Sequence, residues 1–164
     1  MVYVLADNII SPLGETSEEN YQAVKAGRSA IHAYTPMTDG IPDGFMASLL
    51  SLNFDVSDKR TIFILSSTKG AIEQLGKVDD KDLYLGETVL RVSRRLGFKT
   101  KPIVVCNACI SGLAAIILAC RLLQLGTYDK AVVCGADCPG RFIISGFQSL
   151  NAMSPVSCRP FDIE

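Results

Sequence analysis

Short runs of apolar and β-branched residues alternate with helix-like segments along this chain. The runs RTIFILSST (residues 60–68), PIVVC (102–106) and KAVVCGAD (130–137) are typical of strands buried on both faces of a sheet. Apolar residues recur at helical spacing over residues 82–97, between the first two runs, and fill residues 109–125, between the last two. This alternation predicts an α/β fold with a mostly parallel sheet.

Two of the predicted elements differ from the rest in their composition. The segment from residue 109 is apolar on nearly all sides as far as Arg121, which predicts a central, buried helix. Its end is predicted at Gly126. Residues 146–164, in contrast, carry Gly, Asn, Ser and Pro and are expected to form loop and turn.

The N-terminal part of the chain predicts one strand and one helix. The run VYVLADNII (residues 2–10) has the composition of a strand. Thr16 or Ser17, followed by two glutamates, predicts the start of a helix that Gly27 ends. Residues 28–55 contain several prolines and glycines without a clear period, and we expect an irregular surface segment there.

Length and composition limit the class of protein. A chain of 164 residues is long enough to fold as one domain with a sizeable core, so we predict a single domain over residues 1–164. Hydrophobic residues make up 48% and charged residues 20%, which argues against disorder. The net charge of −1, without a basic stripe, predicts no binding to nucleic acid.

The sequence also favours a cytoplasmic location. The N-terminus has neither a basic region nor a small-residue cleavage site, as a signal peptide would. The longest apolar run, residues 113–120, is far shorter than the ~20 residues of a membrane span, so no membrane partner is expected. The six cysteines are therefore interpreted as thiols rather than as a disulfide framework.

Cys109 stands where the strand-like run ends and the apolar helix is predicted to begin. Ligands of parallel α/β sheets gather at this edge. The N–H groups of a first helical turn favour an anion, so they would stabilise a thiolate and the oxyanion formed when it attacks a thioester. Most cysteines inside cells are nevertheless buried and inert. The residues alone leave both interpretations open.

The remaining cysteines and the single histidine give weaker signals. Cys106 and Cys109 form a CxxC, which could be a redox pair or half of a metal site, but no second CxxC or histidine pair follows. We therefore predict neither a metal nor a cofactor. Cys120, Cys134 and Cys158 are interpreted as structural thiols, and His32 as a surface residue.

Several fragments, taken in order, resemble one family. SPLG, AGRSAI, SST, NACISG, CGADC, GFQSLNAMSP and CRPFD follow one another as in the N-terminal half of the β-ketoacyl synthases, the condensing enzymes of fatty-acid and polyketide synthesis. The resemblance implies a thiolase-like fold, of which this chain would form the N-terminal half with three α-β-α layers. It also implies a decarboxylative condensation of an acyl thioester with a malonyl thioester on acyl carrier protein.

The resemblance assigns Cys109 as the acyl-accepting nucleophile and its backbone N–H as one donor of the oxyanion hole. The family's other catalytic groups, two histidines or a histidine and an asparagine together with a lysine, belong to a C-terminal half that this sequence does not contain. We therefore expect the chain to be incomplete and inactive alone in condensation. The alternative is a non-catalytic partner subunit of a ketosynthase, a chain length factor, although these subunits replace the cysteine.

The resemblance also implies partners. Acyl carrier protein would deliver the acyl and malonyl thioesters, and two copies of the chain would pair through the strand from Pro102 to Cys106 as a homodimer. A cluster of basic residues around the preceding helix could receive an acidic carrier protein. Its members are Arg91, Arg94, Arg95, Lys99 and Lys101.

Overall fold

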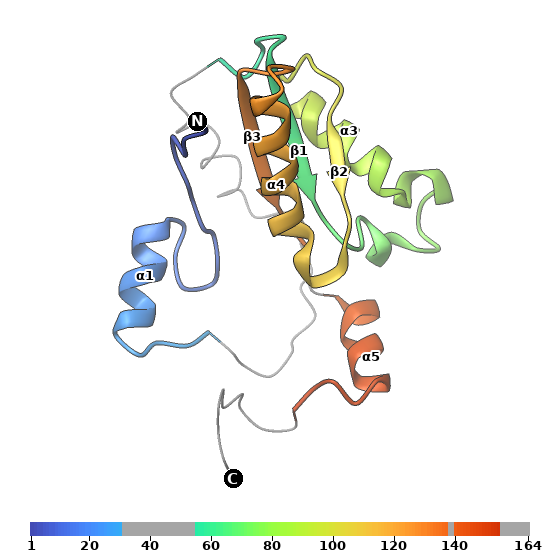
Figure 1. Cartoon of the computed structure of the whole chain (residues 1–164). Helices are drawn as coiled ribbons and strands as arrows, with labels where there is room; N and C mark the ends of the chain where they lie inside the picture. Colours follow the sequence, from blue (N-terminus) through green and yellow to red (C-terminus); the bar gives the residue numbers. More distant parts are fainter. Residues whose placement is uncertain (31–54, 138–139, 155–164) are drawn as a thin grey trace. The chain divides into compact units, whose positions relative to one another are not determined.

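The computed structural model describes residues 1–30, 55–137 and 140–154 (Figure 1). The chain divides into two compact units, which are described separately. The first unit consists of Met1–Val4 and Phe54–Cys138, and the second consists of Leu5–Asn53 and Pro139–Glu164. The single domain over residues 1–164 therefore stays a prediction.

The first unit contains a three-stranded parallel sheet. Its strands are β1 (Thr61–Ser66), β2 (Ile103–Val105) and β3 (Lys130–Gly135), in the spatial order β2-β1-β3. β1 pairs with both neighbours, so that Ile64 lies opposite Ile103 on one side and Val133 on the other. All three strands lie within the runs that predicted them. Every residue of β1 is buried, as expected for a central strand covered on both faces.

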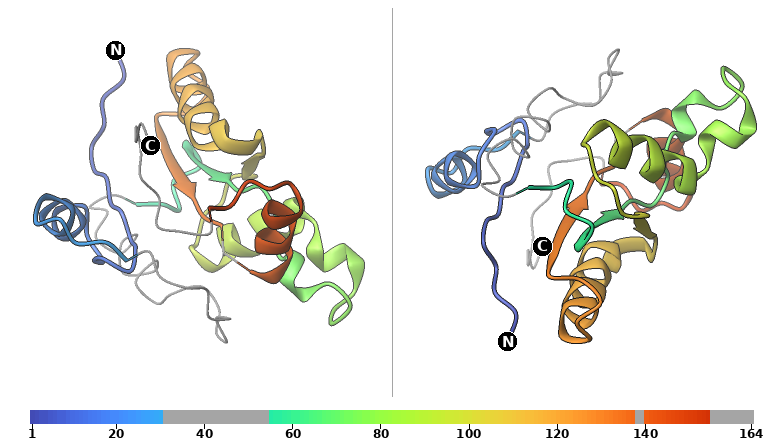
Figure 2. Two further views of the ribbon diagram at one scale, coloured as in Figure 1. Left: turned by 90° about the horizontal axis from the view of Figure 1, so that it is seen from below. Right: turned by 90° about the horizontal axis from the view of Figure 1, so that it is seen from above.

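One helix covers each face of this sheet (Figure 2). α3 (Leu85–Arg95) packs against β1 and β2, and α4 (Ser111–Gln124) packs against all three strands on the opposite face. Two short 3₁₀ helices, Ile72–Gln74 and Asp80–Leu83, precede α3. The predicted α/β fold with a parallel sheet and three α-β-α layers is confirmed.

Alternate residues of β1 supply the two sides of the core. Ile62 and Ile64 pack with Ala115 and Ala119, which lie one turn apart on α4 and are small enough to let the helix approach the sheet. On the other face, the rings of Phe63 and Phe98 lie with their centroids 5.0 Å apart. Burial of a side chain such as Phe63 contributes about 2–3 kcal/mol, so these contacts fix both helices on the sheet.

Glycines end α3 and α4 as the sequence predicts. Gly97 has φ +86°, its N–H donates to the carbonyl of Arg94, and the N–H of Phe98 donates to that of Ser93. Gly126, with φ +69°, follows α4 and donates in the same way to Leu123. These are Schellman caps, in which a residue without Cβ adopts the left-handed conformation at no steric cost.

In the second unit, Thr16 rather than Ser17 caps α1 (Ser17–Lys25). Its hydroxyl accepts the Glu19 N–H at 3.1 Å, and the Glu19 carboxylate accepts the Thr16 N–H at 3.2 Å, which completes a capping box. Within the same unit, the Asn20 side chain donates to the carbonyls of Ile9, Gly14 and Thr16. The preceding loop is therefore tied to the helix.

The prediction of a strand over residues 2–10 was wrong. These residues pair with no strand in the described part of the chain, and the side chains of Tyr3, Val4 and Leu5 are exposed. An apolar β-branched run becomes a strand only where another strand offers its N–H and C=O groups. Most of the irregular segment expected at 28–55 (residues 31–54) lies outside the described residues.

Two further expectations need correction. Residues 146–149, expected as loop, lie in the helix α5 (Arg141–Ser149), because the apolar residues of RFII, just upstream, continue at helical spacing to Phe147. α4 is not buried all round: Ala115 and Ala119 face the sheet, whereas Leu113 is 61% and Ile116 is 52% exposed. α4 carries apolar residues on nearly all sides, and the sequence analysis interpreted this composition as complete burial. The face of α4 that points away from the sheet is therefore apolar and exposed.

Candidate functional site

Three segments meet at the carboxyl edge of the sheet. Ser67 and Thr68 follow β1, Cys106 follows β2, and Asp137 follows β3. Because the strands are parallel, their carboxyl ends lie at the same edge. The connections that leave β1 and β2 cover opposite faces of the sheet (Figure 2), which makes this edge a topological switch point of the kind where α/β folds place ligands.

Cys109 lies on a short 3₁₀ turn, Ala108–Ile110, between β2 and α4. The predicted helix therefore begins at Ser111, two residues later than expected, and Cys109 precedes it. The turn is closed by the Ile110 N–H, which donates to the carbonyl of Asn107 at 3.1 Å. Cys109 is exposed, so it is not a buried core residue.

Ser111 organises the backbone around Cys109. The Ser111 hydroxyl accepts the N–H of Asn107 at 2.7 Å and donates to the carbonyl of Ala108 at 2.7 Å. Ser111 is itself buried, and Ala108 adopts φ +45° in the bend. The position of Cys109 is thus fixed by hydrogen bonds of its neighbours rather than left to a free loop.

The N–H of Cys109 is placed to receive an anion. The N–H of Cys109 donates to no acceptor within the described part of the chain, and no side chain caps the N-terminus of α4. Unpaired N–H groups at the start of a helix stabilise negative charge. An oxyanion formed beside Cys109 would find a donor in this N–H.

The sequence analysis assigned no role to Asp137, which binds the ends of two strands together. Its carboxylate accepts from the Ser67 hydroxyl at 2.9 Å and from both the N–H and the hydroxyl of Thr68 at 3.0 Å. The Thr68 carbonyl in turn lies 3.8 Å from the sulfur of Cys106, which donates to it. The available signal was a polar residue close to the end of a predicted parallel strand, as for Cys109.

The other cysteines differ in accessibility. Cys106 is exposed like Cys109, Cys120 is half-buried, and Cys134 is buried in β3. Burial raises the pKa of the Cys134 thiol to about 12, which agrees with a structural thiol. Cys158 and His32 lie outside the described residues. No group of three metal-ligating side chains occurs among the residues that are described.

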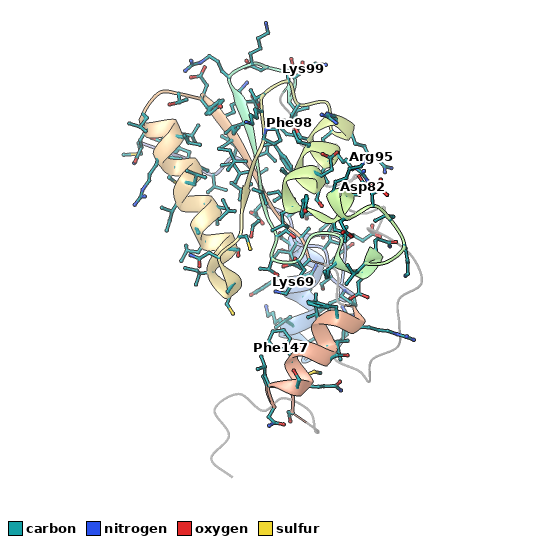
Figure 3. The ribbon with its side chains drawn as sticks, turned by 90° about the vertical axis from the view of Figure 1, so that its right-hand side faces the viewer. Lys69, Asp82, Arg95, Phe98, Lys99 and Phe147 are labelled. Carbon is teal, nitrogen blue, oxygen red and sulfur yellow. The ribbon has the colours of Figure 1, made fainter. Side chains whose placement is uncertain are left out.

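The basic cluster lies at the other end of the sheet from Cys109. Lys99 and Lys101 precede β2, whereas Cys106 and Cys109 follow it, and Figure 3 shows Lys99 at the opposite end of this unit from Lys69, which follows Thr68. Arg91 forms ion pairs with Asp82 and, at 3.4 Å, with Glu87. This position gives no support to carrier-protein docking beside the thiol.

Comparison with known proteins relates part of this chain to one family. Residues 89–164 match the model of the β-ketoacyl synthase N-terminal domain. No curated protein matches the chain.

Among the helices of the described residues, none has the length and apolar character needed to cross a membrane.

A similar solved structure covers nearly all of the chain. It is one chain of the ketosynthase ApeO in complex with its chain length factor ApeC from Xenorhabdus doucetiae, with a TM-score of 0.68 and 22% identity. The match covers 93% of this chain and 51% of that one, so this chain spans about half of its length. The resemblance to the β-ketoacyl synthases is thus confirmed: residues 89–164, which include Cys109, match the N-terminal domain of that family, and the chain has the α/β fold of part of a solved ketosynthase complex.

Proposed function

We propose that this chain is the acyl-accepting part of a 3-oxoacyl-[acyl-carrier-protein] synthase and that Cys109 is its nucleophile. The observation that carries the proposal is the position of the Cys109 thiol. It is exposed at the carboxyl edge of a parallel sheet, two residues before α4 begins, and the N–H of Cys109 is unpaired within the described residues. That combination supports attack on a thioester, since an inert core thiol would be buried.

The first half-reaction follows from this geometry. The Cys109 thiolate attacks the carbonyl carbon of an acyl thioester, and the carbonyl oxygen becomes an oxyanion. The N–H of Cys109 donates to that oxygen, while the N-terminal end of α4 lowers the energy of the negative charge. Collapse of the intermediate expels the carrier thiolate, which takes up a proton, and leaves the acyl group on the sulfur of Cys109.

The second half-reaction needs groups outside this chain. By the resemblance, a malonyl thioester on acyl carrier protein loses carbon dioxide, and its carbanion attacks the acylated Cys109. Histidine or asparagine side chains and a lysine of the other half would assist this step. Since the chain spans about half of the solved relative, we propose that it accepts an acyl group alone and condenses only with the remaining half.

Acylation is tested by incubating the chain with acyl-coenzyme A or acyl carrier protein and locating the adduct by peptide mass spectrometry. The expected result is one acyl group on Cys109, which Cys109→Ala abolishes. Cys106→Ser is the matched control, because this second exposed thiol lies only three residues before Cys109. An adduct that persists in Cys109→Ala, or none on the wild-type chain, would reject the proposal.

A chain-length-factor-like subunit is the second candidate. The solved relative is a complex of a ketosynthase with its chain length factor, and likeness of fold alone does not separate the two roles. The presence of Cys109 favours the catalytic role, because by the resemblance chain length factors replace this cysteine. If the chain bound a catalytic ketosynthase subunit but took up no acyl group from either donor, the partner role would replace the proposed one.

We also propose a homodimer formed through β2. This strand of three residues is at the edge of the described sheet, and its side chains are only half-buried. An unpaired edge offers N–H and C=O groups to a second strand, and the family joins its subunits there. Light scattering at micromolar concentration should give twice the mass of the chain; the mass of a single chain would rule the dimer out.

A further inference from the structure

Cys106 is an exposed thiol that the acyl-transfer proposal does not use. Among the described cysteines, only Cys106 and Cys109 are exposed, and two residues separate them. Cys134 is buried, and Cys120 is half-buried on α4. An oxidant dissolved in water therefore reaches this pair before the other described thiols.

The backbone bends between the two cysteines. Along an extended strand, residues three apart would lie about 10 Å from each other, whereas a disulfide joins Cα atoms ~4.4–6.8 Å apart. Here the strand ends at Val105, Ala108 adopts φ +45°, and a 3₁₀ turn begins at Ala108. The hydroxyl of Ser111 holds both the N–H of Asn107 and the carbonyl of Ala108, so the two residues between the cysteines are fixed in the bend.

Cys106 is held at the same edge of the sheet as Cys109. Its sulfur donates to the carbonyl of Thr68 at 3.8 Å, and Thr68 is bound through its N–H and hydroxyl to the Asp137 carboxylate. The sulfur of Cys106 is therefore already engaged in a hydrogen bond. Cys109, whose own N–H is unpaired within the described residues, is the thiol that we expect to react first, and Cys106 is the one that follows.

We propose that Cys106 and Cys109 form a reversible redox switch, in which hydrogen peroxide converts the two thiols to a disulfide that blocks acylation. The sulfur of Cys109 attacks one peroxide oxygen, the O–O bond breaks, and sulfenic acid and hydroxide result. The sulfur of Cys106 then attacks the sulfenic sulfur, the S–O bond breaks, and hydroxide leaves. With the two thiol protons, the peroxide is reduced to two molecules of water, and a dithiol reductant restores both thiols.

The disulfide itself does not depend on the proposed function, but its effect on acylation does. The test treats the full chain with hydrogen peroxide, blocks the remaining thiols with an alkylating reagent, and maps the peptides by mass spectrometry before and after dithiothreitol. We expect a bond between Cys106 and Cys109 that dithiothreitol reverses, with loss and recovery of Cys109 acylation. Cys120→Ser should behave as the wild type does.

The variant Cys106→Ser separates a switch from mere oxidation. Without the second thiol, the sulfenic acid of Cys109 should proceed to sulfinic acid, and dithiothreitol should no longer restore acylation. Sulfinic acid on Cys109 of the wild-type chain, with Cys106 still reduced, would overturn the proposal. A reversible disulfide in a chain that is never acylated would support the redox pair and reject the acyl-transfer function.

Discussion

At the scale of single residues, the contrast between Cys109 and Cys134 is the most informative one. Both follow or lie in strands of apolar residues, and the sequence alone left Cys109 open between a core thiol and a nucleophile. The strand–helix junction correctly predicted its place at the edge of the sheet, but not the 3₁₀ turn that separates it from α4. That turn depends on hydrogen bonds of the Ser111 hydroxyl, which no periodic pattern reveals.

Cys134 should make the stability of the chain depend on alkaline pH. In the folded state burial raises the pKa of this thiol to about 12, whereas an unfolded chain loses the proton at about pH 8.5. Between these values the folded chain holds a proton that the unfolded chain has released, so the free energy of unfolding falls as pH rises.

Urea unfolding from pH 8 to pH 11 measures this effect. The wild type should lose stability more steeply than Cys134→Ala, which has no thiol to ionise on unfolding. Parallel pH profiles for the two proteins would show that Cys134 is not held as a neutral thiol.

At the scale of elements, some helices and strands could be predicted from the local sequence pattern, whereas others depended on tertiary contacts. β1, β2 and β3 were predicted correctly because runs such as TIFILS are apolar at every position, which favours a strand covered on both faces. Residues 2–10 carry the same kind of residue but find no partner strand, and pairing is a property that a single segment cannot encode. α5 was missed because Gly146 and the serines indicated a loop, although Ile143, Ile144 and Phe147 keep helical spacing.

Packing of α4 on the sheet depends on small side chains. Ala115 is fully buried against Ile62 and Ile64, whereas the neighbouring Ile116 is 52% exposed. Ala115→Leu would force extra atoms into this contact and should lower the free energy of unfolding by about 1–3 kcal/mol. Ile116→Ser, on the outward face of the same helix, should change it by less than about 0.5 kcal/mol. Equal effects of the two changes in urea unfolding would contradict the packing described for α4.

At the scale of the whole molecule, two surfaces of the first unit lack a partner in the described chain. One is the outward face of α4, where Leu113, Ile116 and Ile117 are exposed. The other is the open edge of β2. The sequence predicted the first as buried, because it records the apolar composition of a helix but not what covers it.

The β2 edge provides a direct test of the proposed dimer. The Val105 carbonyl accepts from Ser67 next to β1, so Val104, which alternates with it, directs its N–H to the open edge. Val104→Pro removes that donor and leaves the pairing with β1 in place. It should convert a dimer to a monomer by light scattering, while Val104→Ile should remain a dimer. A dimer that survives Val104→Pro would place the interface elsewhere.

The central claim is that Cys109 is a nucleophile activated by its position before α4, and competitive alkylation tests it most directly. The chain is treated at pH 7 with a small amount of iodoacetamide, and the rates of modification at Cys109 and Cys106 are measured by peptide mass spectrometry. Both thiols are exposed, so accessibility does not separate them. The account predicts that Cys109 reacts about tenfold faster or more. Equal rates, or faster reaction at Cys106, would contradict it.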